Sequence, residues 1–225
     1  MARRLLEKPL YRAGALLATG QVDVMVAGAE SPTRRVIEAA GMTVGMALGV
    51  TLPSSFFLMF FPKRPALIFA DCAVNVAPDA EGLVAIALAS ARSAEALLGT
   101  ARLAMLSFST GASGTGATVD RVAKAVALLK AEGVSAVGPI QADAALNAGI
   151  AAKKGMTAAV DANVLVFPSL DAGNIAYKLA QELAGAQAIG PILQGFARPV
   201  CDLSRGAKVE EIVAATALTL ALTRG

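Results

Sequence analysis

The 225-residue sequence contains no histidine and no tryptophan. Without histidine, a Ser-His-Asp or Cys-His nucleophile cannot form, and every zinc site that depends on imidazole is excluded. Acid–base chemistry must then fall to carboxylates, lysines or bound groups. The two cysteines, Cys72 and Cys201, are too few for a disulfide framework, lack metal-ligand spacing and are interpreted as structural thiols. These absences fit a cytoplasmic enzyme with no metal site.

Aromatic residues are also scarce, at 4% of the chain, whereas hydrophobic residues make up 56% and the mean hydropathy is +0.61. The core must therefore be built from alanine, leucine, valine and isoleucine, and the length allows one large domain or two small ones. The formal net charge of +3 comes from scattered residues with no aromatic platform beside them. This pattern argues against a nucleic-acid partner.

The high hydropathy raises the question of a membrane segment. The segment 42–61, within the longest uncharged run, is interrupted by Gly45, Gly49 and Pro53, so we interpret it as a helix end, a loop and a buried strand. Near the N-terminus, charged residues and Pro9 stand where a signal peptide needs its apolar core. We therefore expect neither a targeting segment nor a membrane partner.

Short apolar runs alternate with segments of helical periodicity along almost the whole chain. Apolar and β-branched runs predict strands at 22–28, 54–61, 66–70, 102–108 and 164–168. The spacing of Ala and Leu predicts helices at 3–19, 31–40, 78–98, 118–132, 142–152, 177–183 and 208–222. This alternation predicts an α/β fold with a largely parallel sheet and flanking helices, whose ligands bind at the loops that follow the strands.

The segment 199–206, Pro-Val-Cys-Asp-Leu-Ser-Arg-Gly, places a hydroxyl, a guanidinium and a flexible glycine directly before an apolar-periodic helix. Backbone N–H groups at such a helix start can receive an anion, and Arg205 adds a planar donor fork suited to phosphate. Glu211 lies seven residues after Ser204, in the first turn of this helix. The alternative interpretation is an ordinary helix start with a favourable first-turn acid.

A second candidate site is the loop 107–116, which is rich in glycine, serine and threonine and joins a predicted strand to a predicted helix. Its glycines allow backbone N–H groups to approach an anion closely, although the loop matches neither the P-loop nor the dinucleotide fingerprint. The alternative is a flexible crossover loop. The candidate ligands in it are Ser107, Ser109, Thr110, Gly111 and Ser113.

A third candidate is the start of the helix predicted at 31–40, with Ser31 as N-cap and Pro32 at the first helical position. Arg34 and Arg35 lie in its first turn, where the helix dipole disfavours cations. Misplaced charge of this kind suggests a ligand or a partner, and a solvated helix face is the alternative.

Taken together, these segments resemble the phosphate acetyltransferase, or phosphotransacetylase, family. The segments that carry the resemblance follow the family's order and spacing over nearly the whole chain: 54–59, 71–75, 106–110, 162–168, 171–174, 190–195 and 199–206. The resemblance also implies that the chain starts well inside the family's usual sequence, so that it is N-terminally shortened and its first domain is incomplete.

The resemblance implies an isocitrate/isopropylmalate dehydrogenase-like architecture of two α/β domains and a homodimer. We expect residues 1–50 and 195–225 to form the first domain and residues 51–194 the second. It further implies the reaction of acetyl-CoA with phosphate to give acetyl phosphate and CoA. Coenzyme A is then a substrate, and no resident cofactor is expected.

By the family's pattern, Ser204 and Arg205 match the catalytic serine and arginine, and Glu211 stands where the family has a general-base aspartate. The loop 107–116 matches the phosphate side, and Asn174 is a further substrate-binding candidate. An arginine expected in the early helix falls on Glu38, so that Arg34 and Arg35, one turn earlier, are the candidates to replace it.

The residues favour direct transfer in a ternary complex, because Ser204 has no histidine to activate it as a nucleophile. Two alternatives to a phosphate acetyltransferase follow from the departures from the family pattern. One is a catalytically weak or inactive acyl-CoA-binding regulatory module, like the phosphotransacetylase-like domain of malic enzymes. The other is a fragment whose exposed apolar surface drives association.

Overall fold

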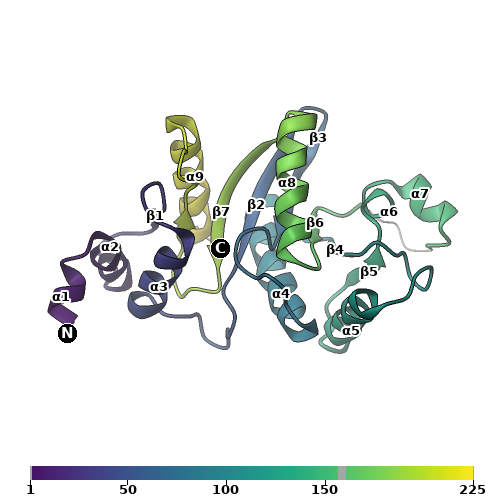
Figure 1. Ribbon diagram of the computed structural model, residues 1–225, viewed down its shortest axis with the longest axis horizontal. Helices are drawn as coiled ribbons and strands as arrows, with labels where there is room; N and C mark the ends of the chain where they lie inside the picture. The colour runs from purple at the N-terminus through teal and green to yellow at the C-terminus, as the bar shows by residue number, and fades with distance from the viewer. Residues whose placement is uncertain (1, 157–160, 225) are drawn as a thin grey trace. The chain divides into compact units, whose positions relative to one another are not determined.

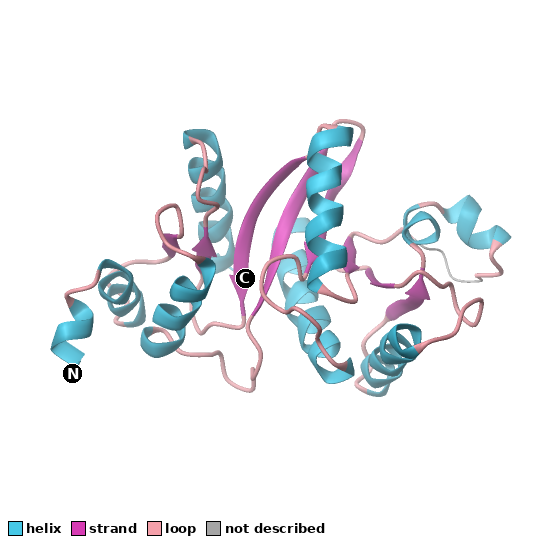
Figure 2. Ribbon diagram, viewed as in Figure 1, coloured by secondary structure: helices cyan, strands magenta, loops and turns pink. Residues whose placement is uncertain are grey.

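The computed structural model describes residues 2–156 and 161–224, in which helices and strands alternate along the chain (Figures 1 and 2). The strands are β1 (Met25–Ala27), β2 (Ser54–Phe61), β3 (Arg64–Ala70), β4 (Leu103–Leu106), β5 (Ala136–Ile140), β6 (Val164–Val166), β7 (Gln187–Gln194) and β8 (Val200–Asp202). The helices are α1 (Ala2–Leu6), α2 (Pro9–Ala18), α3 (Thr33–Thr43), α4 (Ala80–Leu98), α5 (Ala117–Ala131), α6 (Ala142–Leu146), α7 (Ala148–Lys153), α8 (Leu170–Ala184), α9 (Val209–Ala221) and the 3-10 helix η1 (Leu222–Arg224).

The chain divides into two compact units, and the first comprises Met1–Phe57 and Ile189–Gly225. In this unit β8 pairs in parallel with β1 and antiparallel with β7. Helix α9 packs on β1 and β8, while α2 contacts β1 and α3 contacts β8. Leu17, Val36, Phe56 and Ile192 are among the fully buried side chains of this unit. The core is aliphatic for the most part, as the composition requires.

The second unit, Leu58–Ala188, contains the parallel strand order β3-β6-β4-β5. Helix α4 packs on β3, β4 and β6, and α5 packs on β4, β5 and α4. Because neighbouring strands are parallel, the loops that follow β3, β4, β5 and β6 leave the same edge of the sheet. The boundaries between the two units fall within β2 and β7, a few residues from the predicted domain boundaries.

The predicted α/β class, with a mostly parallel sheet and flanking helices, is confirmed. Several details differ. The helix predicted at 142–152 is broken at Asn147, whose extended backbone ends α6 and whose side chain accepts the N–H groups of Gly149 and Ile150 at the start of α7. A short polar side chain that caps its own backbone in this way competes with helix continuation.

Two helix starts also differ from the prediction. Ser31 is not the N-cap of α3: its N–H bonds to the Gly28 carbonyl in a turn, and Pro32 takes the cap position. Helix α8 begins at Leu170 rather than at 177, because the Ser169 hydroxyl accepts the Ala172 N–H and caps it. The predicted exit loop after β6 is therefore the first turns of a helix.

In the described part of the chain, no helix combines the length and the apolar character that crossing a membrane requires.

Candidate active site

The turn after β8 in unit 1 presents Ser204 and Arg205 at the surface. The Leu203 N–H bonds to the Ala27 carbonyl at 2.6 Å, and the Ala207 N–H bonds to the Ser204 carbonyl at 3.0 Å. These two bonds fix the backbone on both sides of the turn, while the side chains of Ser204 and Arg205 are exposed. Within the described residues, neither side chain has a hydrogen-bond partner, so both are available to a ligand.

Glu211 lies in the first turn of α9, as predicted, and its side chain is exposed. Its Oε2 accepts the backbone N–H of Lys208 at 2.9 Å, which satisfies a donor at the helix start. Glu210 and Glu211 together also oppose the partial positive charge of this helix end. One carboxylate oxygen of Glu211 is thus engaged in the cap, and the other remains free to act on a ligand.

No role was predicted for the carboxylate of Asp202, which lies two residues before Ser204. Asp202 is 2% exposed, and its Oδ2 accepts a short hydrogen bond from the Thr33 hydroxyl. Its Oδ1 is buried and has no partner among the described residues. Burial raises the pKa of Asp202 to about 6, and the bond from Thr33 offsets part of this rise.

This raised pKa predicts a measurable pH dependence of stability. Between about pH 4 and pH 6 the folded state keeps a proton that unfolded Asp202 has lost, so the free energy of unfolding falls as pH rises through this window. Allowing for solvent screening, we expect a loss of about 1–2 kcal/mol. Urea unfolding across this pH range should show a smaller fall in the free energy of unfolding for Asp202→Asn than for the wild type. Asp23→Asn, at an exposed position, is the control. An equal pH dependence of the free energy of unfolding in wild type and Asp202→Asn would contradict the raised pKa of Asp202.

The first turn of α3 carries the other candidates of unit 1. Arg34 and Arg35 are exposed there, and in the described residues neither forms an ion pair with a carboxylate. Glu38, one turn later, accepts the hydroxyl hydrogen of Tyr11 at 3.0 Å, and this bond raises the pKa of Tyr11. Glu38 therefore joins α2 to α3 through this hydrogen bond.

In unit 2, the loop 107–116 is held by its own hydroxyls. Ser107 Oγ accepts the Ser109 N–H at 3.2 Å, and Ser113 Oγ accepts the Thr110 N–H and lies 3.1 Å from Ser109 Oγ. The Gly111 N–H bonds to the Pro139 carbonyl at 2.8 Å. The hydroxyls and the amides of Ser109, Thr110 and Gly111 thus shape the loop.

The free donors lie further along this loop. In the described residues, the amides of Ala112, Gly114 and Thr115 have no acceptor, and the first amides of α5 have none within the helix. Gly116, at φ +137°, adopts a conformation that favours glycine at the point where the loop enters α5. Asp120 adds a negative charge to the first turn, so an anion would bind nearer the glycines than the helix.

We therefore expect inorganic phosphate to bind at the glycine end of this loop. In an amide-resolved NMR titration, the signals of Ala112, Gly114 and Thr115 should move more than those of Ser109 and Thr110, whose N–H groups already have partners. The result that would contradict this expectation is a titration in which phosphate moves no signal of the loop.

Asn174 lies in α8, and its side chain donates to the Cys72 carbonyl at 3.1 Å. A Cβ on Gly173 would lie 2.4 Å from the Asp71 carbonyl oxygen, so only glycine permits this approach of α8 to the loop after β3. That loop is shaped by the Asp71 carboxylate, which accepts the N–H groups of the residues that follow it. Asn174 is thereby fixed at the edge of the sheet where the candidate loops begin.

Three polar residues at this edge were not predicted. Gln141 directly follows β5, and its side-chain oxygen accepts hydrogen bonds from Thr110 Oγ1 at 3.3 Å and from Lys154 Nζ at 2.9 Å. Lys154 also forms an ion pair with Asp143. Arg121 of α5 donates to the Pro168 carbonyl at 3.0 Å. Gln141 could have been found from the sequence because it directly follows a strand. It was missed because β5 was not predicted.

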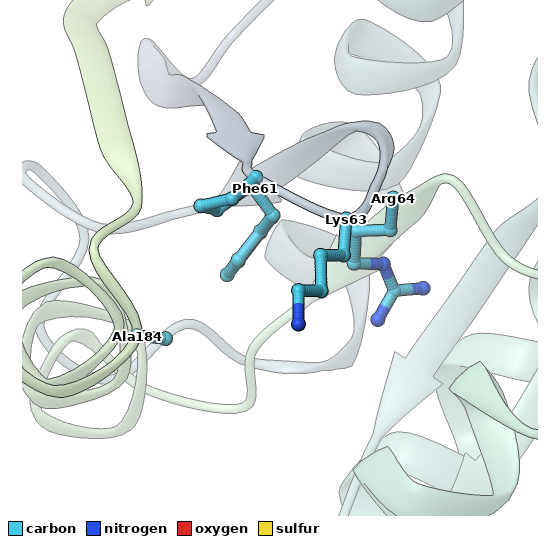
Figure 3. A pocket seen from close by; sticks show the side chains of 5 residues that line it. Phe61, Lys63, Arg64 and Ala184 are labelled. Atoms are coloured by element: carbon cyan, nitrogen blue, oxygen red, sulfur yellow. The ribbon is translucent and has the colours of Figure 1, made fainter.

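A pocket of about 280 Å³ lies elsewhere in unit 2, at the turn between β2 and β3 (Figure 3). It is lined by Phe61, Pro62, Lys63, Arg64 and Ala184. The turn precedes the first residue of β3, whereas the candidate loops follow the last residues of the parallel strands. The pocket therefore lies at the opposite end of β3 from the loop after it, and we do not assign it to the active site.

The two thiols are buried, and burial raises the pKa of Cys72 well above its usual value and that of Cys201 to about 12. Thiols of this kind are inert at neutral pH, consistent with a structural role. Across residues 2–156 and 161–224, no three His, Cys, Asp or Glu side chains gather as they would around a metal ion.

The sequence profile of the family described as phosphate acetyl/butaryl transferase matches residues 1–220. The chain belongs to this family. A phosphate acetyltransferase of Paracoccus denitrificans is 43% identical over 226 residues, which cover 96% of this chain and 71% of that protein. The crystal structure of a phosphotransacetylase from Streptococcus pyogenes superposes with a TM-score of 0.92 at 38% identity and covers 98% of this chain and 69% of its own.

More distant structures share the fold of this phosphate acetyl/butaryl transferase family member. A 4-hydroxythreonine-4-phosphate dehydrogenase from Klebsiella pneumoniae is 16% identical with a TM-score of 0.58. Similarity at this level concerns the fold alone. The resemblance that seven segments carried over nearly the whole chain is thereby confirmed.

Proposed function

We propose that this chain is a phosphate acetyltransferase that moves an acetyl group between the sulfur of coenzyme A and inorganic phosphate. The observation that carries this proposal is the 43% identity to a phosphate acetyltransferase over 96% of the chain. The reaction converts acetyl-CoA and phosphate to acetyl phosphate and CoA and is reversible. Coenzyme A is a substrate, and we assign no resident cofactor.

From unit 1 we assign Ser204, Arg205 and Glu211 to the chemistry. Arg205 neutralises the attacking or leaving phosphate through its planar donor fork. Ser204 donates a hydrogen bond to the oxyanion that forms on the acetyl carbonyl or to the sulfur. Both side chains are exposed and lack partners in the described residues, which supports these roles.

Glu211 is assigned as the base that accepts the thiol proton of CoA when acetyl phosphate is the acetyl donor. A thiol has a pKa near ~8.5 and a free glutamate one near ~4.3, so the transfer is uphill by roughly 5–6 kcal/mol unless the bound substrate desolvates the carboxylate. Substrate must supply that desolvation, because Glu211 is exposed in the free chain. Its Oε2 is held by the helix cap, which leaves Oε1 for the proton.

The remaining candidates are assigned to substrate binding. In unit 2 these are Asn174 and the loop residues Ser107, Ser109, Thr110, Gly111 and Ser113. The hydrogen bonds of these loop residues shape the loop, and the amides of Ala112, Gly114 and Thr115 are left free to bind phosphate. In unit 1 they are Arg34 and Arg35, which are exposed and free of carboxylate partners in the described residues.

We propose direct transfer in a ternary complex. An oxygen of hydrogen phosphate attacks the acetyl carbonyl carbon, the carbon–sulfur bond breaks, and the thiolate leaves with the electron pair. The proton that hydrogen phosphate loses ends on the sulfur. An acyl-serine intermediate is disfavoured, because the chain contains no histidine to activate Ser204.

We also propose that the two units are the domains of the protein, that it forms a homodimer and that it functions in the cytoplasm. The buried free thiols suit a reducing compartment.

Helix α8 exposes Ile175, Leu179 and Leu183, spaced four residues apart along one stripe, which a second copy would cover. Light scattering should then give twice the mass of one chain, and Leu179→Glu should lower it.

The test of this function is phosphate-dependent release of free thiol from acetyl-CoA by the purified chain. We expect release that rises with phosphate and saturates. Binding of acetyl-CoA without phosphate-dependent release would instead identify a regulatory module.

A further inference from the structure

Asp202, Thr33 and Gly28 form a contact that joins three segments of unit 1. Asp202 ends β8, Thr33 is the first residue of α3, and Gly28 directly follows β1. The Thr33 hydroxyl donates to Asp202 Oδ2, and a Cβ on Gly28 would lie 2.2 Å from Asp202 Oδ1. The contact therefore ties the strand that leads to Ser204 and Arg205 to the start of the helix that carries Arg34 and Arg35.

The carboxylate cannot itself reach a substrate. Asp202 is 2% exposed, and its Oδ1 is covered where the chain passes at Gly28. Any effect of Asp202 on the reaction must therefore pass through the turn that follows it. That turn is also held by the bond from the Leu203 N–H to the Ala27 carbonyl.

A carboxylate is energetically unfavourable in this buried position. Its Oδ1 has no donor among the described residues, and burial raises its pKa, which means that the ionised form is destabilised in the fold. An amide of the same shape would accept the Thr33 bond without a buried charge. The contact with Thr33 therefore depends on the acceptor oxygen Oδ2 and not on the charge.

We propose that the Thr33–Asp202 hydrogen bond is a positioning latch that fixes the Ser204–Arg205 turn against the first turn of α3. This inference rests on the proposed function, since it assigns a role to residues that hold Ser204 and Arg205. Asp202 and Thr33 are positioning residues, because neither is placed to touch the reacting atoms. A misplacement of about 1 Å in a reacting group can lower a rate by roughly 10²-fold.

The test compares Thr33→Val, which removes the hydroxyl at constant shape, with Thr33→Ser, which retains it. Thr216→Val is the matched control, because it removes a hydroxyl of α9 that donates to the Ile212 carbonyl at 2.7 Å and has no part in the latch. At one neutral pH, we expect Thr33→Val to lower kcat by about 10- to 100-fold with KM for acetyl-CoA within about 3-fold. Thr33→Ser and Thr216→Val should stay within about 3-fold of wild type.

A second measurement reads the latch without activity. Hydrogen exchange followed by mass spectrometry should show faster exchange of peptides covering residues 203–207 in Thr33→Val than in Thr33→Ser or Thr216→Val. Asp202→Asn is measured in parallel. It should keep the exchange slow, because an amide oxygen still accepts from Thr33, and should lower kcat less than Thr33→Val does.

The outcomes separate the two proposals. Wild-type protein that forms no acetyl phosphate refutes the proposed function. The latch is then tested by hydrogen exchange alone. Unchanged exchange in Thr33→Val overturns the latch whatever the rates are. Faster exchange with an unchanged kcat in an active enzyme shows a purely structural bond and overturns the positioning role.

Discussion

Glu211→Gln should slow acetyl transfer by about 10²–10⁴-fold while CoA binding stays almost intact, because the substitution removes only the basic oxygen. Stability should hardly change, since a glutamine at this position can still accept the Lys208 N–H that Glu211 now accepts at 2.9 Å. The loss should appear in kcat and in kcat/KM alike, because the proton is transferred in the transition state. Steady-state kinetics in the direction that consumes CoA and acetyl phosphate measure both.

Two further results belong to this prediction. Glu211→Asp should be tolerated, because it restores the family's usual residue. Raising the pH toward the pKa of the CoA thiol should restore part of the Glu211→Gln rate, because an ionised thiol needs no base. If Glu211→Gln turns over like wild type near neutral pH, Glu211 is only the acid of a helix cap, and another group must accept the proton.

Arg205→Ala should raise KM for phosphate or acetyl phosphate and lower kcat/KM by about 10- to 150-fold. This range corresponds to the loss of a bidentate, charge-assisted contact worth roughly 1.5–3 kcal/mol. The guanidinium is exposed and has no partner in the described residues, so its removal should leave the fold intact. Initial rates over a phosphate series give the effect directly.

Arg205→Lys should recover only part of this loss, because an ammonium group cannot reproduce the planar donor fork. Arg12→Ala provides the matched control: Arg12 is an exposed arginine of the same unit whose side chain donates to the Leu6 carbonyl. Equal phosphate dependence in wild type, Arg205→Ala and Arg205→Lys would remove Arg205 from the site.

The sequence was most informative about the fold where the apolar pattern is strong and long. Strand β2 and helix α4 were predicted nearly to the residue, because each has a continuous apolar signal. Strand β5 was missed because Gly138 and Pro139 interrupt it. Proline is tolerated there because β5 is the edge strand of the order, where one side of the ladder needs no N–H donor. Strand β8 was not predicted either, because it is only three residues long and ends in an aspartate.

The grouping of the candidate residues around the turn after β8 was predictable because these residues are close together in the sequence. Ser204, Arg205 and Glu211 lie within one loop and one helical turn. The contact between Asp202 and Thr33 joins residues 169 positions apart, so no local sequence pattern could predict it. The loop 107–116 was found from its composition, but which of its amides remain free depends on hydroxyl bonds that only the folded loop defines.

The most direct test of acetyl transfer to phosphate is the stoichiometry of acetyl phosphate formed against CoA released when the purified chain is mixed with acetyl-CoA and phosphate. We expect one acetyl phosphate for each free thiol, at a rate that falls in Arg205→Ala. Thiol release that yields acetate instead of acetyl phosphate, or no release from a chain that still binds acetyl-CoA, would contradict it.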